Sequence, residues 1–342
     1  MQVTPWLAAL NTKVVKMRIE NEILLETKDL RKYFTGKKGL LNMNPPVVKA
    51  VDDINLTIRK GETLGLVGES GCGKSTLGRT ILDLIQKTSG QVLYKGEDIA
   101  AYDKKKMWEM RQKMQIIFQD PYSSLNPRMT VYDLVSAPLE VYNIGTPEER
   151  KERVIEMLND VGLDKQYLNR FPHEFSGGQR QRIGIARALI LNPEFVVCDE
   201  AVSALDVSVR AQVLNLMKEM QQKRNLTYLF ISHDLSVVRH VSDRVAVMYL
   251  GSVVEIAGKH ELYGSPVHPY TKALLSAIPI PDANRKRNRI ILEGDVPSAY
   301  NPPSGCKFHT RCPYATEKCR TEVPQLRSVG EDHMVACHRD DL

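Results

Sequence analysis

The pattern of apolar and polar positions predicts strands in the first part of the chain. Residues 23–34 are interpreted as a strand and a turn, and Val47–Arg59 alternates as a half-buried strand does. Thr63–Val67 is a short apolar strand that runs directly into a glycine-rich segment, and residues 76–85 then have apolar positions at helical spacing. A strand, a glycine loop and a helix in this order predict the start of an α/β domain.

The rest of the pattern predicts alternating helices and short buried strands. Residues 147–190 are mostly helical in pattern, with a break near Pro172. The later predicted elements are strands at Phe195–Cys198 and Leu229–Ser232, a periodic helix at Ser208–Arg224 between them, and a hairpin at Arg244–Ile256. This alternation favours a sheet with a parallel core.

Breaker residues mark the predicted boundaries. Residues 35–46 are rich in glycine and proline and are interpreted as a loop, and a boundary falls between residues 257 and 290, where periodicity fades. The predicted parts are an N-terminal extension (1–22), an α/β domain (23–265) with a helical insertion at about 120–175, and a small C-terminal domain (266–342).

Composition narrows the class of protein. The 342 residues are 26% charged and 42% hydrophobic, the balance of a soluble globular protein. The net charge of +6 comes with only 6% aromatic residues and no concentrated basic stripe, so no nucleic-acid partner is expected. No apolar run approaches the ~18 residues that span a bilayer, and the apolar stretch at residues 6–10 is too short for a signal-peptide core. A location in the cytosol, or on the cytosolic side of a membrane, is expected.

The glycine-rich segment carries the strongest chemical signal. Gly68-Glu69-Ser70-Gly71-Cys72-Gly73-Lys74-Ser75 matches G-x-x-x-x-G-K-[ST] in full. The glycines let successive N–H groups point at phosphate oxygens, and the helix that begins near Lys74 adds its positive end. Lys74 is expected to reach the β- and γ-phosphates, and Ser75 to ligate Mg²⁺. Residues 68 to Thr76 are therefore predicted to bind a nucleotide, since a chance glycine turn would lack the flanking strand and helix.

Four polar residues follow three apolar strands directly. Asp199 and Glu200 end one strand, Gln119 follows another, and His233 follows a third. Ligands bind at the carboxyl ends of strands in such sheets. We expect Asp199 to hold the Mg²⁺ water shell, Glu200 to act as general base, Gln119 to ligate Mg²⁺ or water, and His233 to contact a γ-phosphate. Surface acids and a structural histidine are the alternatives.

A second anion-binding helix end is predicted at Ser176-Gly177-Gly178-Gln179, before a helix over about 180–190. One domain does not need two such ends for one nucleotide. The helix end at residues 176–179 would have a function if it contacts a nucleotide that is bound to another copy of the chain or to a partner. The alternative is a plain helix cap by Ser176.

Together, six segments resemble the nucleotide-binding subunits of ABC transporters, in that family's order and spacing. They are Gly68–Thr76 (Walker A), Gln119 (Q-loop), Ser176–Gln179 (signature), Val196–Glu200 (Walker B), Ser203–Asp206 (D-loop) and His233 (switch histidine). The resemblance implies a P-loop NTPase fold of the ABC type, with a parallel sheet core, an antiparallel β subdomain and a helical subdomain. It also implies hydrolysis of ATP held between the Walker A motif of one chain and the signature of another.

Further segments are similar to the dipeptide and oligopeptide importers. They are Leu30–Phe34, Ile116–Arg128 and His268–Thr271, while Pro121–Ser124 and Val202–Val209 look more like the DppF/OppF paralogue than the DppD/OppD one. This resemblance implies an ATPase at the cytoplasmic face of the membrane that energises peptide import. Its implied partners are a paralogous ATPase subunit, two permease subunits and, indirectly, an extracytoplasmic peptide-binding protein.

Three positions qualify the resemblance. Ala201 stands where the family usually has proline, which we expect to loosen the turn that aims Glu200. The signature begins with Phe175 rather than leucine. For adenine stacking the family uses an aromatic residue before the first long strand, and Phe34 aligns best, with Tyr33 as the near alternative.

Four cysteines crowd into the C-terminal part of the chain. Cys306, Cys312, Cys319 and Cys337 have spacings of x5, x6 and x17, which match neither zinc ribbons nor ferredoxins. A metal site is favoured over disulfides in a cytosolic chain. The resemblance implies a [4Fe–4S] cluster. Zinc, with His309, His333 and His338 as spare ligands, and free thiols stay open.

Two other functions compete with peptide import. An importer of nickel or another small solute can use the same scaffold. A soluble ABC-type ATPase acting on ribosomes or DNA is a second alternative, but such proteins usually carry two ATPase units or a long insertion.

Overall fold

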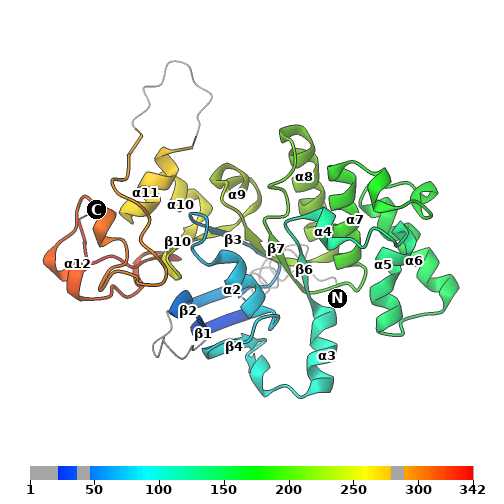
Figure 1. The fold of residues 1–342 in the computed structure, drawn as a ribbon, viewed down its shortest axis with the longest axis horizontal. Helices are drawn as coiled ribbons and strands as arrows, with labels where there is room; N and C mark the ends of the chain where they lie inside the picture. The colour runs from blue at the N-terminus through cyan, green and yellow to red at the C-terminus, as the bar shows by residue number, and fades with distance from the viewer. Residues whose placement is uncertain (1–21, 37–46, 279–288, 342) are drawn as a thin grey trace, which may run out of the picture. The chain divides into compact units, whose positions relative to one another are not determined.

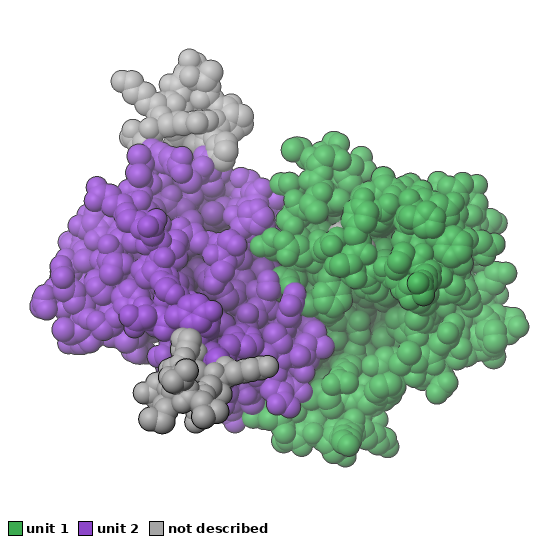
Figure 2. All heavy atoms as spheres, viewed as in Figure 1, with its two compact units in different colours: residues 1–26, 57–62, 93–229 green, residues 27–56, 63–92, 230–342 purple. Residues whose placement is uncertain are grey.

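The computed structural model describes residues 22–36, 47–278 and 289–341. Nearly all of the predicted N-terminal extension, most of the predicted loop at 35–46 and part of the predicted boundary region at 257–290 lie outside these residues. The chain forms two compact units (Figure 2). Unit 1 comprises residues 1–26, 57–62 and 93–229, and unit 2 comprises residues 27–56, 63–92 and 230–342.

Two long strands, β1 (Ile23–Thr35) and β2 (Val47–Arg59), lie mostly in unit 2 and confirm the predicted strands. The turn predicted within residues 23–34 is wrong, because β1 continues through that range. The N–H of Asp29 and the guanidinium of Arg31 bond to Asn55 and Asp53. Residue numbers rise along β1 while those of its partners on β2 fall, so the two strands are antiparallel. β4 (Ser89–Tyr94) lies on the other side of β1 (Figure 1).

A second group of strands in unit 2 has the order β11-β12-β10-β9-β3. β3 (Thr63–Val67) pairs in parallel with β9 (Arg244–Tyr249), and β9 forms the predicted hairpin with β10 (Ser252–Gly258). β10 then pairs with β12 (His333–Val335), which pairs with β11 (Arg327–Gly330), both in the antiparallel sense. The C-terminal residues therefore extend the same sheet that holds the strand before the glycine loop.

Helix α2 begins at Lys74, as the glycine motif predicts, and ends at Ile81. The prediction that helical pattern continues to residue 85 is wrong, because Asp83 has a left-handed backbone with φ of +53°. Other helical segments of unit 2 are α9 (Leu235–Val241), α10 (Lys259–Gly264), α11 (Pro269–Ser276), α12 (Glu317–Thr321) and the 3₁₀ turn η4 (His309–Arg311). Gly65 lets α9 approach β3 closely, since a Cβ there would lie 2.4 Å from Val238 Cγ1.

Unit 1 contains the parallel pair β6 (Met114–Ile117) and β7 (Phe195–Asp199). The strand β8 (Thr227–Ile231) begins in unit 1 and lies next to β7. The end of β4 pairs with β5 (Glu97–Asp98). The helices are α3 (Lys104–Lys113), α4 (Pro121–Ser124), α5 (Val131–Val141), α6 (Pro147–Asp160), α7 (Gly177–Leu189) and α8 (Val207–Arg224), with 3₁₀ turns at Ile99–Ala101, Lys165–Tyr167 and Pro172–Glu174. The predicted break near Pro172 and the predicted periodic helix after residue 207 are confirmed.

Local sequence explains where the helices of unit 1 begin. Thr130 and Thr146 each close a capping box, with Asp133 and Glu149 as the reciprocal acids. Pro147 occupies the first turn of α6, where its missing N–H is not needed. Within the part of the chain that the structure describes, no helix combines the length and the apolar character needed to cross a membrane.

A buried carboxylate joins the C-terminal strands to the rest of unit 2. Glu255 on β10 is fully buried. Its oxygens accept the N–H groups of Val267 (2.7 Å) and His268 (3.0 Å), and His333 Nε2 on β12 lies 2.8 Å away. Because these partners come from two separate segments, this carboxylate orders the loop before α11 and the last strand together.

Replacing Glu255 with alanine should lower the free energy of unfolding by about 3 kcal/mol, because buried donors lose their acceptor. The measurement is the midpoint of urea unfolding. Glu331→Ala, an exposed control in the turn between β11 and β12, should change the free energy by less than about 0.5 kcal/mol. Equal midpoints for the two variants would contradict this account.

Candidate functional site

The loop between β3 and α2 has a backbone that only glycine can supply at two positions. Gly68 has φ of +154° and Gly73 has φ of +105°. A Cβ at Gly68 would lie 2.2 Å from the carbonyl oxygen of Met248, and one at Gly73 would lie 1.9 Å from that of Ala50. Gly73 caps α2 with no side-chain hydrogen bond. The N–H groups of the first turn of α2 therefore face the loop, as an anion-binding helix end requires.

Lys74 is folded over this loop. It is 5% exposed, and its Nζ donates to the carbonyl oxygens of Gly68 (2.8 Å) and Glu69 (3.0 Å). Ser75 and Thr76 follow in the first turn of α2 and are half-buried. The predicted phosphate-loop residues thus form one structural unit, with the ammonium group held above the loop.

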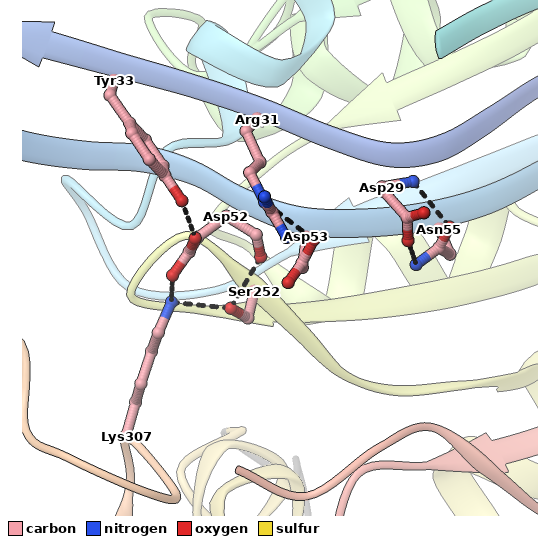
Figure 3. Close-up of polar contacts among 8 residues, drawn as sticks. All are labelled: Asp29, Arg31, Tyr33, Asp52, Asp53, Asn55, Ser252 and Lys307. Atoms are coloured by element: carbon pink, nitrogen blue, oxygen red, sulfur yellow. Dashed lines mark hydrogen bonds and ion pairs between the residues drawn. The ribbon is translucent and has the colours of Figure 1, made fainter. Parts of the chain in front are cut away.

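The structure separates the two aromatic candidates on β1. The hydroxyl of Tyr33 donates a hydrogen bond to Asp52 Oδ1 (Figure 3). Burial, followed by this hydrogen bond, raises the pKa of Tyr33. Phe34 is the next residue of the strand and so points to the opposite face, where it is 41% exposed with Lys32 Nζ 4.8 Å from its ring centroid. Tyr33 is held within unit 2, whereas Phe34 presents its ring to solvent.

Unit 1 brings together Gln119 and the acids at the end of β7. Asp199 is 1% exposed at the last position of the strand. Glu200 follows in a left-handed conformation with φ of +48°, and Gln119 Nε2 donates to its Oε2 at 2.9 Å. The N–H and hydroxyl of Ser203 both donate to the carbonyl oxygen of Glu200 at 3.0 Å. Two hydrogen bonds therefore hold the turn in which Ala201 replaces the usual proline.

Ser176 caps α7, as the plainer interpretation of this segment requires. Its hydroxyl accepts the N–H of Gln179, whose side-chain oxygen accepts the N–H of Ser176 in return. Gly178 is fixed by packing, because a Cβ there would lie 2.2 Å from Val209 Cγ1 on α8. Asp206 caps α8 by accepting the N–H of Val209 at 3.0 Å. The signature and D-loop segments thus lie at two helix ends that pack on each other.

His233 lies in unit 2, between β8 and α9, and its side chain is exposed. The next residue, Asp234, caps α9 by accepting the N–H groups of Ser236 and Val237. The histidine is therefore held at the start of a capped helix.

The four C-terminal cysteines gather in unit 2. The N–H of Cys306 donates to the carbonyl oxygen of Cys319 at 2.8 Å. Burial, with added repulsion from the thiolates of Cys319, Cys337 and Cys312, raises the pKa of Cys306 to about 11. All four cysteines are free.

These cysteines do not form a coordinating arrangement. Among the described residues, no group of three or more His, Cys, Asp or Glu side chains is placed to hold a metal ion. The histidines named as spare zinc ligands bond elsewhere: His309 to the carbonyl oxygen of Cys306, His333 to Glu255, and His338 to the carbonyl oxygen of Glu322. The geometry does not support the prediction of a cluster or zinc site.

Sequence reasoning missed three residues that contact the glycine loop or the strand β2. Arg311 forms an ion pair with Glu69, the hydroxyl of Tyr270 accepts the N–H of Glu69, and Lys307 binds Asp52. A signal was present, because Lys307 directly follows Cys306 and Arg311 directly precedes Cys312. A basic residue next to each of two cysteines in the sequence was the available signal that Lys307 and Arg311 have a role.

Within unit 2, the parallel strand β3, the glycine loop and the helix α2 after it define a P-loop NTPase. Residues 51–203 match the family model described as ABC transporter, and residues 254–319 match the one described as Oligopeptide/dipeptide transporter, C-terminal region.

Among relatives, the chain is 55% identical to the oligopeptide transport ATP-binding protein AppF of Bacillus subtilis, over 93% of this chain and 97% of AppF. It is 51% identical to the probable peptide ABC transporter ATP-binding protein y4tS of Sinorhizobium fredii, over 93% of this chain and 90% of y4tS. The dimeric structure of MJ0796, a bacterial ABC transporter cassette, matches with a TM-score of 0.61 and 28% identity, over 69% of this chain and 98% of that one. The chain belongs to the ATP-binding proteins of the oligopeptide ABC transporter family, and the predicted fold class is confirmed.

Packing at the signature helix can be tested with two glycines of α7. Gly178→Ala should destabilise unit 1 by about 1–3 kcal/mol, because the new methyl group meets Val209. At Gly184 a Cβ would meet no heavy atom within 4 Å. Gly184→Ala should therefore be neutral or stabilise the helix by up to about 1 kcal/mol. Urea unfolding measures both, and equal destabilisation would contradict the packing.

Proposed function

We propose that this chain is the ATP-hydrolysing subunit of an importer of di- or oligopeptides. The observation that carries the proposal is the 55% identity with an oligopeptide transport ATP-binding protein along 93% of the chain. The match of residues 254–319 to the C-terminal region of oligopeptide and dipeptide transporters supports the same substrate class. It favours peptides over nickel or another small solute, and transport over work on ribosomes or DNA.

The residues around the nucleotide have separate roles in this proposal. Lys74 and the loop amides bind the phosphates, and His233 contacts the γ-phosphate. Glu200 polarises the attacking water as general base. The hydrogen bond from Gln119 supports this role, because it fixes one oxygen of the Glu200 carboxylate. Phe34 stacks on adenine, since its ring is exposed while the hydroxyl of Tyr33 is bound to Asp52.

We propose that Mg²⁺ binds together with the nucleotide, because each of its proposed ligands offers an oxygen donor. Ser75 offers a hydroxyl, Asp199 a carboxylate, and Gln119 keeps its amide oxygen as an acceptor while its Nε2 bonds Glu200. Such hard oxygen ligands suit this ion. When bound, Mg²⁺ neutralises charge on the β- and γ-phosphates. Ser75 and Gln119 would hold it, and Asp199 would hold its water shell.

The signature supplies the second half of the site. We propose that Ser176–Gln179 and Asp206 contact ATP held by a partner ATPase, so that two nucleotide domains close head to tail. The exposed, capped start of α7 is suited to this use. The partner would be a paralogous ATPase subunit. Closure would move two permease subunits at the cytoplasmic face of the membrane, with a peptide-binding protein acting outside.

The division into parts is also proposed. Residues 23–265 form the ATPase domain, in which the helical subdomain spans about 120–175, and residues 266–342 form a C-terminal domain after an extension at 1–22. Helices α5 and α6 fall in the proposed helical subdomain. The four cysteines fall in the proposed C-terminal domain.

We propose that the C-terminal cysteines bind a [4Fe–4S] cluster, with zinc as the alternative metal, and that their side chains turn toward the metal on binding, since in the described residues no three of them are placed to hold one. Support comes from their mutual proximity, which contributes to the raised pKa of Cys306. Four soft thiolates suit either iron–sulfur or zinc. Cys306, Cys312, Cys319 and Cys337 would be the ligands, with a structural role for the group when bound.

Glu200→Gln should lower ATP hydrolysis about 100-fold or more, because general-base catalysis is lost. ATP binding should persist. Phosphate release by the chain assembled with its transporter subunits measures the first effect, and equilibrium nucleotide binding the second. Glu219→Gln, an exposed control on α8, should retain full turnover. Unchanged turnover in Glu200→Gln would remove Glu200 as the base.

Protein purified without oxygen should be brown and contain about four iron and four sulfide ions per chain, as a [4Fe–4S] centre requires. Cys306→Ser should lose most of both, whereas Cys198→Ala, outside the C-terminal domain, should retain them. Metal analysis and visible absorbance are the measurements. A colourless preparation containing zinc would contradict the cluster.

A further inference from the structure

Residues 307–311, the five residues between Cys306 and Cys312, are here named the brace. At its end, Arg311 meets Glu69, the second residue of the glycine loop. Both guanidinium Nη atoms face the carboxylate, with Nη1 at 2.9 Å from Oε2 and Nη2 at 3.3 Å from Oε1. The Arg311 side chain is 8% exposed and that of Glu69 is 27% exposed. Because two nitrogen atoms contact the carboxylate and the Arg311 side chain is largely buried, this ion pair is stronger and more specific in geometry than an exposed ion pair.

Glu69 is held through its backbone as well. Its N–H donates to the hydroxyl of Tyr270 at 2.9 Å, and its carbonyl oxygen accepts Lys74 Nζ at 3.0 Å. Phe308 in the brace packs against Tyr270 with ring centroids 5.4 Å apart. The side chain and N–H of Glu69 are therefore fixed from the C-terminal part of the chain, and its carbonyl oxygen helps to place the phosphate-binding lysine.

The start of the brace makes a second contact. Lys307 Nζ donates to Asp52 Oδ2 (2.8 Å), to Ser252 Oγ (2.7 Å) and to the carbonyl oxygen of Leu250 (2.8 Å), and Figure 3 shows the two side-chain bonds. Lys307 and Asp52 are 13% and 15% exposed. The ammonium group thus ties β2 to the turn between β9 and β10.

That turn continues to the glycine loop. The N–H of Gly251 donates to the carbonyl oxygen of Cys72 at 2.9 Å, and the N–H of Asp52 donates to the carbonyl oxygen of Gly251 at 2.8 Å. Asp52 also accepts the hydroxyl of Tyr33, the neighbour of Phe34 (Figure 3). Lys307 therefore also supports the loop, through the turn that bonds to Cys72.

We propose that the brace positions the glycine loop for ATP, with Arg311 as the main positioning residue acting through Glu69. The inference rests on the proposed nucleotide-binding role of that loop. A loop already held in its binding shape loses less conformational entropy when ATP binds, so its affinity is higher. Because Lys307 follows Cys306 and Arg311 precedes Cys312, anything that ties these cysteines together also fixes both ends of the brace.

Two effects of Arg311 on ATP must be separated. The guanidinium is a positive charge near an anionic ligand. Its removal therefore also weakens ATP binding wherever a direct electrostatic attraction is lost. Positioning acts only through Glu69. A double-mutant cycle with Arg311→Gln and Glu69→Gln distinguishes the two effects, because the positioning effect requires both partners.

The experiment measures the Kd for a fluorescent ATP analogue on the full chain. Arg311→Gln should raise Kd about tenfold in the wild-type background and less than about twofold in the Glu69→Gln background. In hydrolysis assays of the assembled transporter, Arg311→Gln should raise KM more than it lowers kcat. Arg311→Lys, which keeps one donor, should give an intermediate Kd.

The matched control is Arg327→Gln. Arg327 belongs to the same C-terminal region but bonds the carbonyl oxygens of Cys337 and Arg339, so its loss should leave Kd unchanged. Thermal unfolding establishes that each variant is folded. If Arg311→Gln does not fold, Arg311→Lys takes its place in the comparison. A wild-type Kd in a folded Arg311→Gln or Arg311→Lys variant overturns the inference. A tenfold increase in Kd on Arg311→Gln that persists in the Glu69→Gln background also overturns the inference. Failure of the wild type to bind ATP would instead overturn the proposed function.

Discussion

Two backbone positions that admit no side chain determine the shape of the nucleotide loop. Gly68 and Gly73 each bring the chain within contact distance of a carbonyl oxygen, from Met248 and from Ala50. These contacts join the loop to the hairpin of β9 and β10 on one side and to β2 on the other. With both glycines in place, β3 leads into the loop and α2 begins at Lys74. The lysine and the helix end then share one anion-binding space.

The C-terminal residues are part of this arrangement. β12 extends the sheet through β10, Glu255 joins that strand to the loop before α11, and Arg311 reaches Glu69 in the glycine loop. These contacts connect the C-terminal residues to the glycine loop within unit 2. If a cluster binds the four cysteines, it would act next to residues that already contact the loop.

Local sequence patterns predicted much of the fold. Period-two alternation located β2, and the glycine spacing located the loop and the start of α2, because both signals depend only on neighbouring residues. The end of α2 was mispredicted, since the apolar spacing continues past Asp83, where the backbone turns to positive φ. The cap at Ser176 followed from its own side chain.

Other features depend on residues far apart in the chain. Glu69 and Arg311 are separated by 242 positions, so no local pattern predicts their ion pair. The choice between Tyr33 and Phe34 likewise required the position of Asp52 on the neighbouring strand. The crowding of four cysteines near the C-terminus indicated a common site, but coordination depends on side-chain geometry that sequence positions do not determine.

The central claim is that residues 68–76 bind ATP through Lys74. Equilibrium binding of Mg²⁺-ATP to the isolated chain tests it most directly, with Lys74→Met compared to the wild type and thermal unfolding used to establish that both are folded. The account predicts saturable binding by the wild type and its loss in Lys74→Met, because the ammonium group held over the loop is the main cation for the phosphates. Equal affinity in the two proteins would contradict it.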